Sequence, residues 1–227
     1  MPKNRVIPPE GGVSNAEAEF FSILLRPKPA GGLLGTEAVM TKKVLVPIAD
    51  GTEEIEAVAI IDVLRRAGAE VTVASVDRLQ VTASRGVRLV ADRLISECLG
   101  VPYDLVALPG GMPGAEHLRD SSELVEILKS HVGEGRWYAA ICASPAVVLE
   151  HHGLLSGRRA TCHPNFVDRL QNRDAVESRV VVDGRCITSR APGTAIEFAL
   201  KIVEVLYGEE KAREVAMPMV VSPEWVK

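Results

Sequence analysis

Cys142 is the residue of this chain whose surroundings best suit chemistry. It lies in the segment "AAICASPAVV", where a buried strand ends and a helix begins at once. A strand-to-helix turn exposes its side chain at the carboxyl edge of the sheet, where open α/β folds place their sites. The positive potential and free amides of a helix N-terminus lower a thiol pKa, so we expect a thiolate near neutral pH. The alternative is a small buried core residue, because free cysteines often serve that purpose.

Two adjacent glycines follow a second buried strand. Gly110 and Gly111 stand in the segment "LPGGMPGA", and glycine permits a backbone amide to remain exposed there. The N–H groups of Gly111 and Ala143 are candidates for an oxyanion hole, as acyl or aldehyde chemistry requires. Glycine-rich turns after strands are common, so this signal is weak by itself. A phosphate cradle is not indicated, because neither G-x-G-x-x-G nor a G-K-[ST] ending is present.

Three carboxylates crowd the start of the first helix, in the segment "DGTEEIEAV". Glu53 and Glu54 complement the positive end of the helix dipole, which is sufficient reason for their presence. From the residues alone, Glu56 also fits a solvated helix face.

Alternating strands and helices must position these residues. Strands interleaved with helices of ten or more residues predict a mostly parallel sheet covered on both faces. A hairpin is expected at Asp183-Gly184, and short strands around Val81 and at 87–90. A short strand and then a helix starting at Pro164 are expected within 157–171. The other expected strands lie at 43–49, 70–76, within 103–111 and at 136–143; the other expected helices lie at 53–68, 114–119, 121–132, 144–153, 193–208 and 209–216.

The composition argues against nucleic-acid-binding, membrane-spanning and metal-binding proteins. A formal net charge of −4 gives no basic surface for capturing nucleic acid, and no apolar run is long enough to span a membrane. The four cysteines lie far apart, without C-x-x-C pairs or zinc-type spacing, so we expect no metal site and a reducing, cytoplasmic environment.

Residues 1–40 differ from the rest of the chain. They are rich in proline and glycine, with one short apolar patch from Phe20 to Leu25. We expect an extension without core packing, followed by one domain over 41–227. A targeting segment and a partner-docking arm stay open as alternatives, although the acidic residues count against an organelle transit peptide.

The motifs together resemble the ThiJ/PfpI superfamily and, within it, the Parkinson disease protein 7 branch. The resemblance covers residues 43–220 and rests on "GTEEIEAV", "ASRGV", "YDLVALPGG", "AAICASP", "TCHP", "TSRAPGT" and "FALKIVEVLYG". It implies a flavodoxin-like three-layer α/β/α sandwich and a homodimer. It also implies that Cys142 is a nucleophilic, oxidation-prone thiol, that Glu56 is its protonated hydrogen-bonding partner, and that His163 lies nearby.

Further site residues follow from the same resemblance. It assigns backbone amides at the Gly110–Gly111 turn and at Ala143 to the site, and it places Arg85 and Arg190 at the pocket or dimer edge. Intracellular-protease members carry histidine directly after the cysteine, whereas this chain has Ala143, so peptidase activity is not expected. The branch often carries a cysteine before the "SR" motif, where this chain has Ala83. Regulation through that extra thiol is therefore not carried over.

The implied activity needs neither a metal nor an organic cofactor. It is the glyoxalase III-type conversion of methylglyoxal to lactate, with deglycation of early adducts as a related activity. The alternative is a non-enzymatic sensor of oxidative stress, or a redox-regulated chaperone, which uses the same cysteine as a sulfinate held by Glu56.

Overall fold

The structure is a computed structural model that describes residues 41–222 and residue 225. The first 40 residues lie outside the described part of the chain, so their interpretation as an extension stays a prediction.

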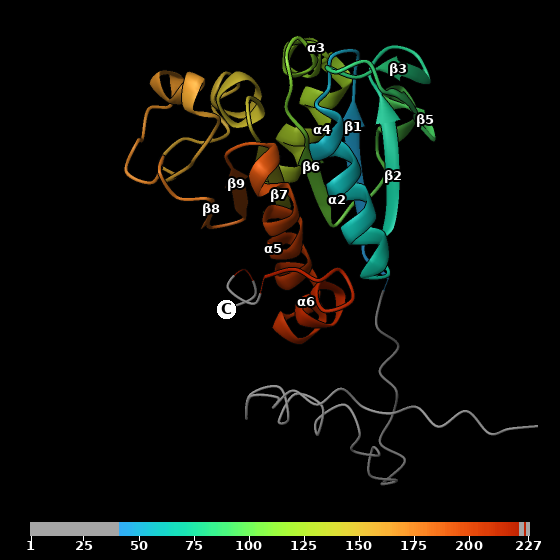
Figure 1. The fold of residues 1–227 in the computed structure, drawn as a ribbon. Coiled ribbons are helices and arrows are strands. Elements are labelled where there is room, and N and C mark those ends of the chain that lie inside the picture. The colour runs from blue at the N-terminus through green and yellow to red at the C-terminus, as the bar shows by residue number, and fades with distance from the viewer. Residues whose placement is uncertain (1–40, 223–224, 226–227) are drawn as a thin grey trace, which may run out of the picture. The chain divides into compact units, whose positions relative to one another are not determined.

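A seven-stranded sheet forms the centre of the domain (Figure 1). Its order is β5-β2-β1-β6-β7-β9-β8, and every neighbouring pair is parallel except β9 and β8. The inner strands are almost continuously apolar because both of their faces are covered. The bounds are β1 (Lys43–Ile48), β2 (Glu70–Ser75), β5 (Arg93–Leu94), β6 (Leu105–Leu108), β7 (Trp137–Ile141), β8 (Val180–Asp183) and β9 (Cys186–Ser189).

Helices cover both faces of this sheet. On one face, α2 (Glu54–Arg66) packs against β1, β2 and α5 (Ala195–Tyr207), and α6 (Glu209–Ala216) packs on α5 (Figure 1). On the other face, α4 (Ser122–Gly133) packs against β6 and β7, and α3 (Gly114–Asp120) lies beside it. The expected flavodoxin-like three-layer fold is confirmed.

The core is built mainly from aliphatic side chains between these layers. Leu45, Leu105 and Leu108 from the central strands are fully buried, and so are Ile60 of α2 and Leu128 of α4. The aromatic residues among the largest buried side chains are Tyr103, Tyr138 and Phe198. Close packing of this kind keeps the strand ends, and therefore the loops that follow them, in fixed positions.

Small elements complete the domain. The strands β3 (Gln80–Thr82) and β4 (Arg88–Val90) form a separate antiparallel pair, and η1 (Ile95–Cys98) follows β5. The expected hairpin turns between β8 and β9, where Gly184 has a φ of 58°. A short 3₁₀ turn, η4 (Pro192–Thr194), leads into α5.

One predicted strand is wrong, and the helix after it is shorter than expected. In the described chain, residues 158–163 form no strand, because the Thr161 N–H donates to the Thr188 side chain at 2.9 Å and its hydroxyl to the Val176 carbonyl at 2.8 Å. These contacts replace a ladder with a neighbouring strand. The helix that begins at Pro164 is a single 3₁₀ segment, η3 (Pro164–Arg169).

Candidate active site

Cys142 occupies a strained turn at the end of β7. Its φ is 64°, a left-handed conformation that is uncommon for a residue with a side chain. Two backbone hydrogen bonds hold it there. The Cys142 N–H donates to the Ser189 carbonyl at 3.0 Å, and its own carbonyl accepts from the His163 N–H at 2.7 Å. Strain that the surrounding structure maintains in this way is typical of functional positions.

The helix after Cys142 is unusually wound. It is a π-helix, η2 (Pro145–Glu150), preceded by the turn residues Ala143 and Ser144. Wide π-helical turns inside helical segments occur frequently at functional sites. The expected strand, turn and helix are therefore all present, but Cys142 is buried, with 7% exposure, instead of having the exposed side chain that the turn predicted.

Glu56 lies against Cys142 and is fully buried. The Gly110 N–H donates to Glu56 Oε2 at 2.7 Å, whereas Oε1 is buried without a hydrogen-bond partner among the described residues. A Cβ atom at Gly110 would lie 2.6 Å from Cys142 Cβ and 2.9 Å from Glu56 Oε2. Only glycine fits at this position, and its lack of a side chain lets the thiol and the carboxyl approach each other.

Burial raises the pKa of Glu56 to about 8, although the hydrogen bond from the Gly110 N–H and the nearby Cys142 thiol act in the opposite direction. The carboxyl therefore holds a proton at neutral pH. This agrees with the protonated partner that the family resemblance implied.

The pKa of the Cys142 thiol has opposing causes. Burial raises it, an ionised Glu56 raises it further, and the N–H groups of Gly111 and Ala143 lower it. The net effect raises the thiol pKa above its ordinary value, so the sequence-based expectation of a lowered pKa is wrong: it counted only the lowering contributions. Because a thiolate and a carboxylate in contact repel each other, the Cys142 thiol and the Glu56 carboxyl titrate as a coupled pair.

The two predicted oxyanion amides converge on the Cys142 sulfur. The N–H groups of Gly111 and Ala143 face the sulfur and favour its ionised form, because both lower the pKa of the thiol. Gly111 has a φ of +91°, and a Cβ there would lie 2.4 Å from both the Glu53 nitrogen and the Gly51 oxygen. Amides fixed in this way are suited to stabilising an oxyanion formed on the carbon that the sulfur attacks.

His163 joins the site mainly through its backbone contact with Cys142. Its ring Nδ1 accepts from the Asn165 N–H at 3.2 Å, which leaves Nε2 to carry the proton of the neutral ring. The ring centre lies 6.1 Å from that of Phe166 in an edge-to-face arrangement.

The two arginines have contacts of their own. The exposed Arg85 donates its backbone N–H to Glu54 at 2.9 Å. Arg190 directly follows Ser189, and its guanidinium pairs with Glu177 at 3.0 Å. Its Nε is buried without a partner among the described residues. Burial raises the pKa of Cys162 to about 12, and the charge of Arg190 acts against that rise. These contacts connect Arg190 to Cys162 and Glu177 rather than to Cys142.

Sequence reasoning missed the roles of Glu53 and Glu54. Both are nearly buried, at 9% and 7% exposure, instead of lying on a solvated helix end. Glu53 accepts the Glu56 N–H at 2.8 Å, and Glu54 accepts the Ser84 hydroxyl at 2.9 Å. The negative charges of Glu53 and Glu54 predicted only a favourable interaction with the helix dipole. Their burial depends on loops that are distant in the sequence.

Ser144 was also missed as part of the site. Its hydroxyl is buried and donates to the Pro109 carbonyl at 2.6 Å. This bond joins the turn after β7 to the turn after β6, so the two turns that supply the oxyanion amides are held together.

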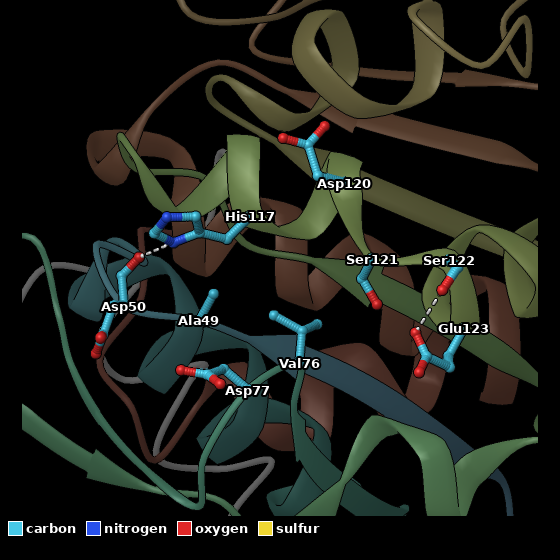
Figure 2. A pocket seen from close by; sticks show the side chains of 9 residues that line it. All are labelled: Ala49, Asp50, Val76, Asp77, His117, Asp120, Ser121, Ser122 and Glu123. Atoms are coloured by element: carbon cyan, nitrogen blue, oxygen red, sulfur yellow. Dashed lines mark hydrogen bonds between the residues drawn. The ribbon is translucent and has the colours of Figure 1, made fainter.

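A separate cavity of about 360 Å³ lies beyond the ends of β1 and β2 (Figure 2). Its carboxylates already have partners, since Asp50 pairs with Arg78, Asp120 with Arg119, and Glu123 accepts the Ser122 hydroxyl. Cys142 does not line this cavity. Across 41–222, no group of three or more histidine, cysteine or acidic side chains is arranged to hold a metal ion.

Comparison with known proteins shows the family to which this chain belongs. The family model described as DJ-1/PfpI matches residues 42–205. The chain belongs to the DJ-1/PfpI family. Within the part of the chain that the structure describes, no helix is long and apolar enough to cross a membrane.

Three relatives give the range of similarity. The chain is 50% identical over 202 residues to Protein DJ-1 homolog B of Arabidopsis thaliana, covering 86% of this chain and 46% of the relative. It therefore spans about half the length of that protein. It is 38% identical over 178 residues to the glutathione-independent glyoxalase DJR-1.2 of Caenorhabditis elegans, covering 78% and 94%. Oxidized Toxoplasma gondii DJ-1 matches in structure with a TM-score of 0.79 and 54% identity, covering 80% of this chain and all of that one.

Proposed function

We propose that this member of the DJ-1/PfpI family is a glutathione-independent glyoxalase that acts on methylglyoxal-type dicarbonyls and deglycates their early adducts. The observation that carries the proposal is the convergence of four groups on one point: a thiol on a strained turn, a buried protonated carboxyl, and two backbone amides. The name of the Caenorhabditis elegans relative supports the same reaction class.

The chemistry starts with addition of the Cys142 sulfur to the aldehyde carbon. A carbon–sulfur bond forms, and the carbonyl electron pair moves onto oxygen to give a hemithioacetal oxyanion. The Gly111 and Ala143 N–H groups stabilise that oxyanion until Glu56 gives it a proton. Each group present therefore has a task in the first step.

Proton transfer completes the reaction without a redox cofactor. Glu56, left ionised by the first step, removes the proton from the sulfur-bearing carbon, and the ketone oxygen takes up a proton to give an enediol. A proton then returns to the neighbouring carbon while the hydroxyl on the sulfur-bearing carbon loses its own. The product is a lactoyl thioester on Cys142. Water cleaves the carbon–sulfur bond and releases lactate and the free thiol, so methylglyoxal and water balance lactate.

Methylglyoxal loss and lactate formation without glutathione test this proposal. The wild-type protein should turn over methylglyoxal, and Cys142→Ser should reduce the rate to background because the nucleophile is lost. Cys162→Ser is the matched control, since Cys162 precedes His163 but is fully buried. If Cys142→Ser keeps the wild-type rate, the mechanism is wrong.

A second function uses the same residues. The amides and the protonated carboxyl that favour an oxyanion also favour a sulfinate on Cys142, and the Toxoplasma gondii relative was solved in an oxidized form. A redox sensor or redox-regulated chaperone would form this sulfinate under peroxide but show no methylglyoxal turnover even as wild type. Intact-mass measurement after peroxide treatment, beside the turnover assay, separates the two functions.

A further inference from the structure

We propose that Glu53 is a positioning residue for the reaction at Cys142: it holds Glu56 and the Gly110–Gly111 turn in one rigid arrangement, and it places a negative charge beside Glu56. The inference rests on the proposed function only for its turnover readout. Its structural content is independent of the reaction that the site performs.

The side chain of Glu53 fixes the start of α2. Glu53 is the N-cap residue, and its carboxylate accepts the backbone N–H of Glu56 at 2.8 Å. N-caps are usually serine, threonine, aspartate or asparagine, and glutamate is not among the preferred residues. The capped amide belongs to the residue whose side chain lies against the thiol. Glu53 therefore orients the acid of the site through that acid's own backbone.

The backbone of Glu53 fixes the glycine turn. Its N–H donates to the Gly110 carbonyl at 2.9 Å, and the Gly110 N–H in turn donates to Glu56 Oε2 at 2.7 Å. The three residues thus form a closed ring of hydrogen bonds. Gly111 packs directly on this ring, because a Cβ there would lie 2.4 Å from the Glu53 nitrogen.

The charge of Glu53 acts on the same acid. Burial is the main cause that raises the pKa of Glu56, and the Glu53 carboxylate raises it further. Burial raises the pKa of Glu53 itself; of the charged groups that face it, Glu54 also raises this pKa and Arg85 lowers it. An ionised Glu53 therefore favours the protonated form of Glu56 that can give a proton to an oxyanion.

If Glu53 were only the N-cap of α2, a different result would be expected. A cap without further effect would change the stability of α2, by about 0.5–2 kcal/mol in general, and leave the titration of Glu56 untouched. The proposal requires that Glu56 itself change.

Two substitutions at Glu53 separate the cap from the charge. Glu53→Gln keeps a side-chain oxygen that accepts the Glu56 N–H but removes the charge, whereas Glu53→Ala removes both. The matched control is Glu54→Gln, in the same turn and equally buried, whose contacts go to Ser84 and Arg85.

The first readout is the titration of Glu56 by ¹³C NMR on protein labelled at glutamate carboxyls, with the signal assigned by its loss in Glu56→Gln. The titration midpoint should move to lower pH in Glu53→Gln and stay unchanged in Glu54→Gln. An unchanged midpoint in Glu53→Gln overturns the proposal. This result does not depend on turnover, so a wild-type protein without glyoxalase activity would remove the proposed function and leave this test intact.

The second readout is methylglyoxal turnover across pH. Glu53→Ala should lower kcat about 10- to 100-fold with a smaller change in KM, because a misplaced catalytic group affects the chemical step. Glu53→Gln should retain most of kcat at neutral pH and lose it at a lower pH than wild type. If Glu53→Ala does not fold, Glu53→Gln still decides the question. Equal loss of thermal stability in both variants, with kcat and the pH profile of wild type, would show an ordinary cap.

Discussion

Cys142 and Glu56 act on each other at the scale of single residues. The thiol is 7% exposed and the carboxyl is completely enclosed, so each strongly affects the charge of the other. The proton on Glu56 therefore has two effects: it permits a thiolate beside the carboxyl, and it supplies the hydrogen that an oxyanion needs.

Replacing Glu56 by glutamine tests both effects. Glu56→Gln keeps an N–H that can donate to the sulfur but cannot transfer a proton, so methylglyoxal turnover should fall about 10²–10⁴-fold. Glu54→Gln should keep most of the activity. Because Glu56 has a pKa of about 8, wild-type turnover that uses it as an acid should decline as the pH rises through that value. Steady-state rates of methylglyoxal turnover from pH 6 to 9 provide the measurement. Equal rates for Glu56→Gln and Glu54→Gln would contradict the prediction.

The same group affects folding. Its pKa in the folded protein is raised above the ordinary value of 4.5, so the unfolded chain loses this proton first as the pH rises. The associated stability is fully present below about pH 4.5 and is lost as the pH rises through about 8. In Glu56→Gln this part of the pH dependence should disappear. Urea midpoints at pH 5 and pH 8 check the prediction, and an unchanged difference between them would contradict it.

At the scale of elements, local patterns predicted most of what positions the site. The run of apolar residues before Cys142 and the proline after Ser144 signal a strand, a turn and a helix without distant information. The glycines after β6 similarly predicted an open turn. The false strand near Thr161 shows the limit, because side-chain bonds to Thr188 and Val176 replaced a ladder there.

The burial of Glu53 and Glu54 could not be predicted from the sequence, because it depends on loops that are distant in the chain. Glu53 and Glu54 carry charges that normally face water, and only contacts with the turn at Gly110 and with Ser84 explain their enclosure. The protonated state of Glu56 followed from family resemblance and not from its own neighbours in the chain. The bond from Ser144 to Pro109 joins two separate turns and leaves no local signal.

Gly110 is the element-scale position most sensitive to change. Gly110→Ala would place a methyl group 2.6 Å from Cys142 Cβ and 2.9 Å from the Ile141 carbonyl oxygen, so β6 and β7 would have to separate. We expect a loss of about 1–3 kcal/mol of stability and of most turnover. Gly133→Ala, at the end of α4 with open space around it, should be neutral or slightly stabilising. Thermal melts of both variants compare the two sites, and a harmless Gly110→Ala would refute the close approach.

His131 influences stability at the scale of the whole molecule. It lies in the last turn of α4 at 4% exposure, and burial together with the charge of Arg136 lowers its pKa to about 4. The unfolded chain therefore takes up a proton below about pH 6.5, while the folded protein resists protonation until about pH 4. Stability associated with this residue is present above pH 6.5 and is lost as the pH falls through 4.

Substitution of His131 should flatten the acid side of the stability curve. His131→Gln removes the titrating group, so its urea midpoint should change less between pH 7 and pH 4.5 than that of wild type. His151→Gln is the control, because His151 is exposed. An equally steep decline in His131→Gln would mean that other groups cause the acid sensitivity.

We also propose a homodimer, as family resemblance implied. Ile55 and Val58 are exposed on α2 at 58% and 48%, beside the segment that carries the exposed Val87 and Val90. Light scattering should give twice the 24.4 kDa mass of the chain. Ile55→Glu should weaken the association, whereas Met217→Glu, at an exposed apolar residue of the segment after α6, should not. A monomeric wild type at micromolar concentration would contradict the proposal.

The strand order has a consequence for how the protein is made. The sheet places β9 directly against β7, although more than forty residues separate them in the chain, and the Ser189 carbonyl is the acceptor for the Cys142 amide. A ribosome releases β7 first, and domains generally fold once the whole unit has emerged. Until β9 has been synthesised, Cys142 lacks the Ser189 carbonyl that holds its turn in the left-handed conformation. The nascent polypeptide therefore carries Cys142 as an ordinary thiol, and reactivity specific to the folded turn begins only when synthesis has passed Ser189.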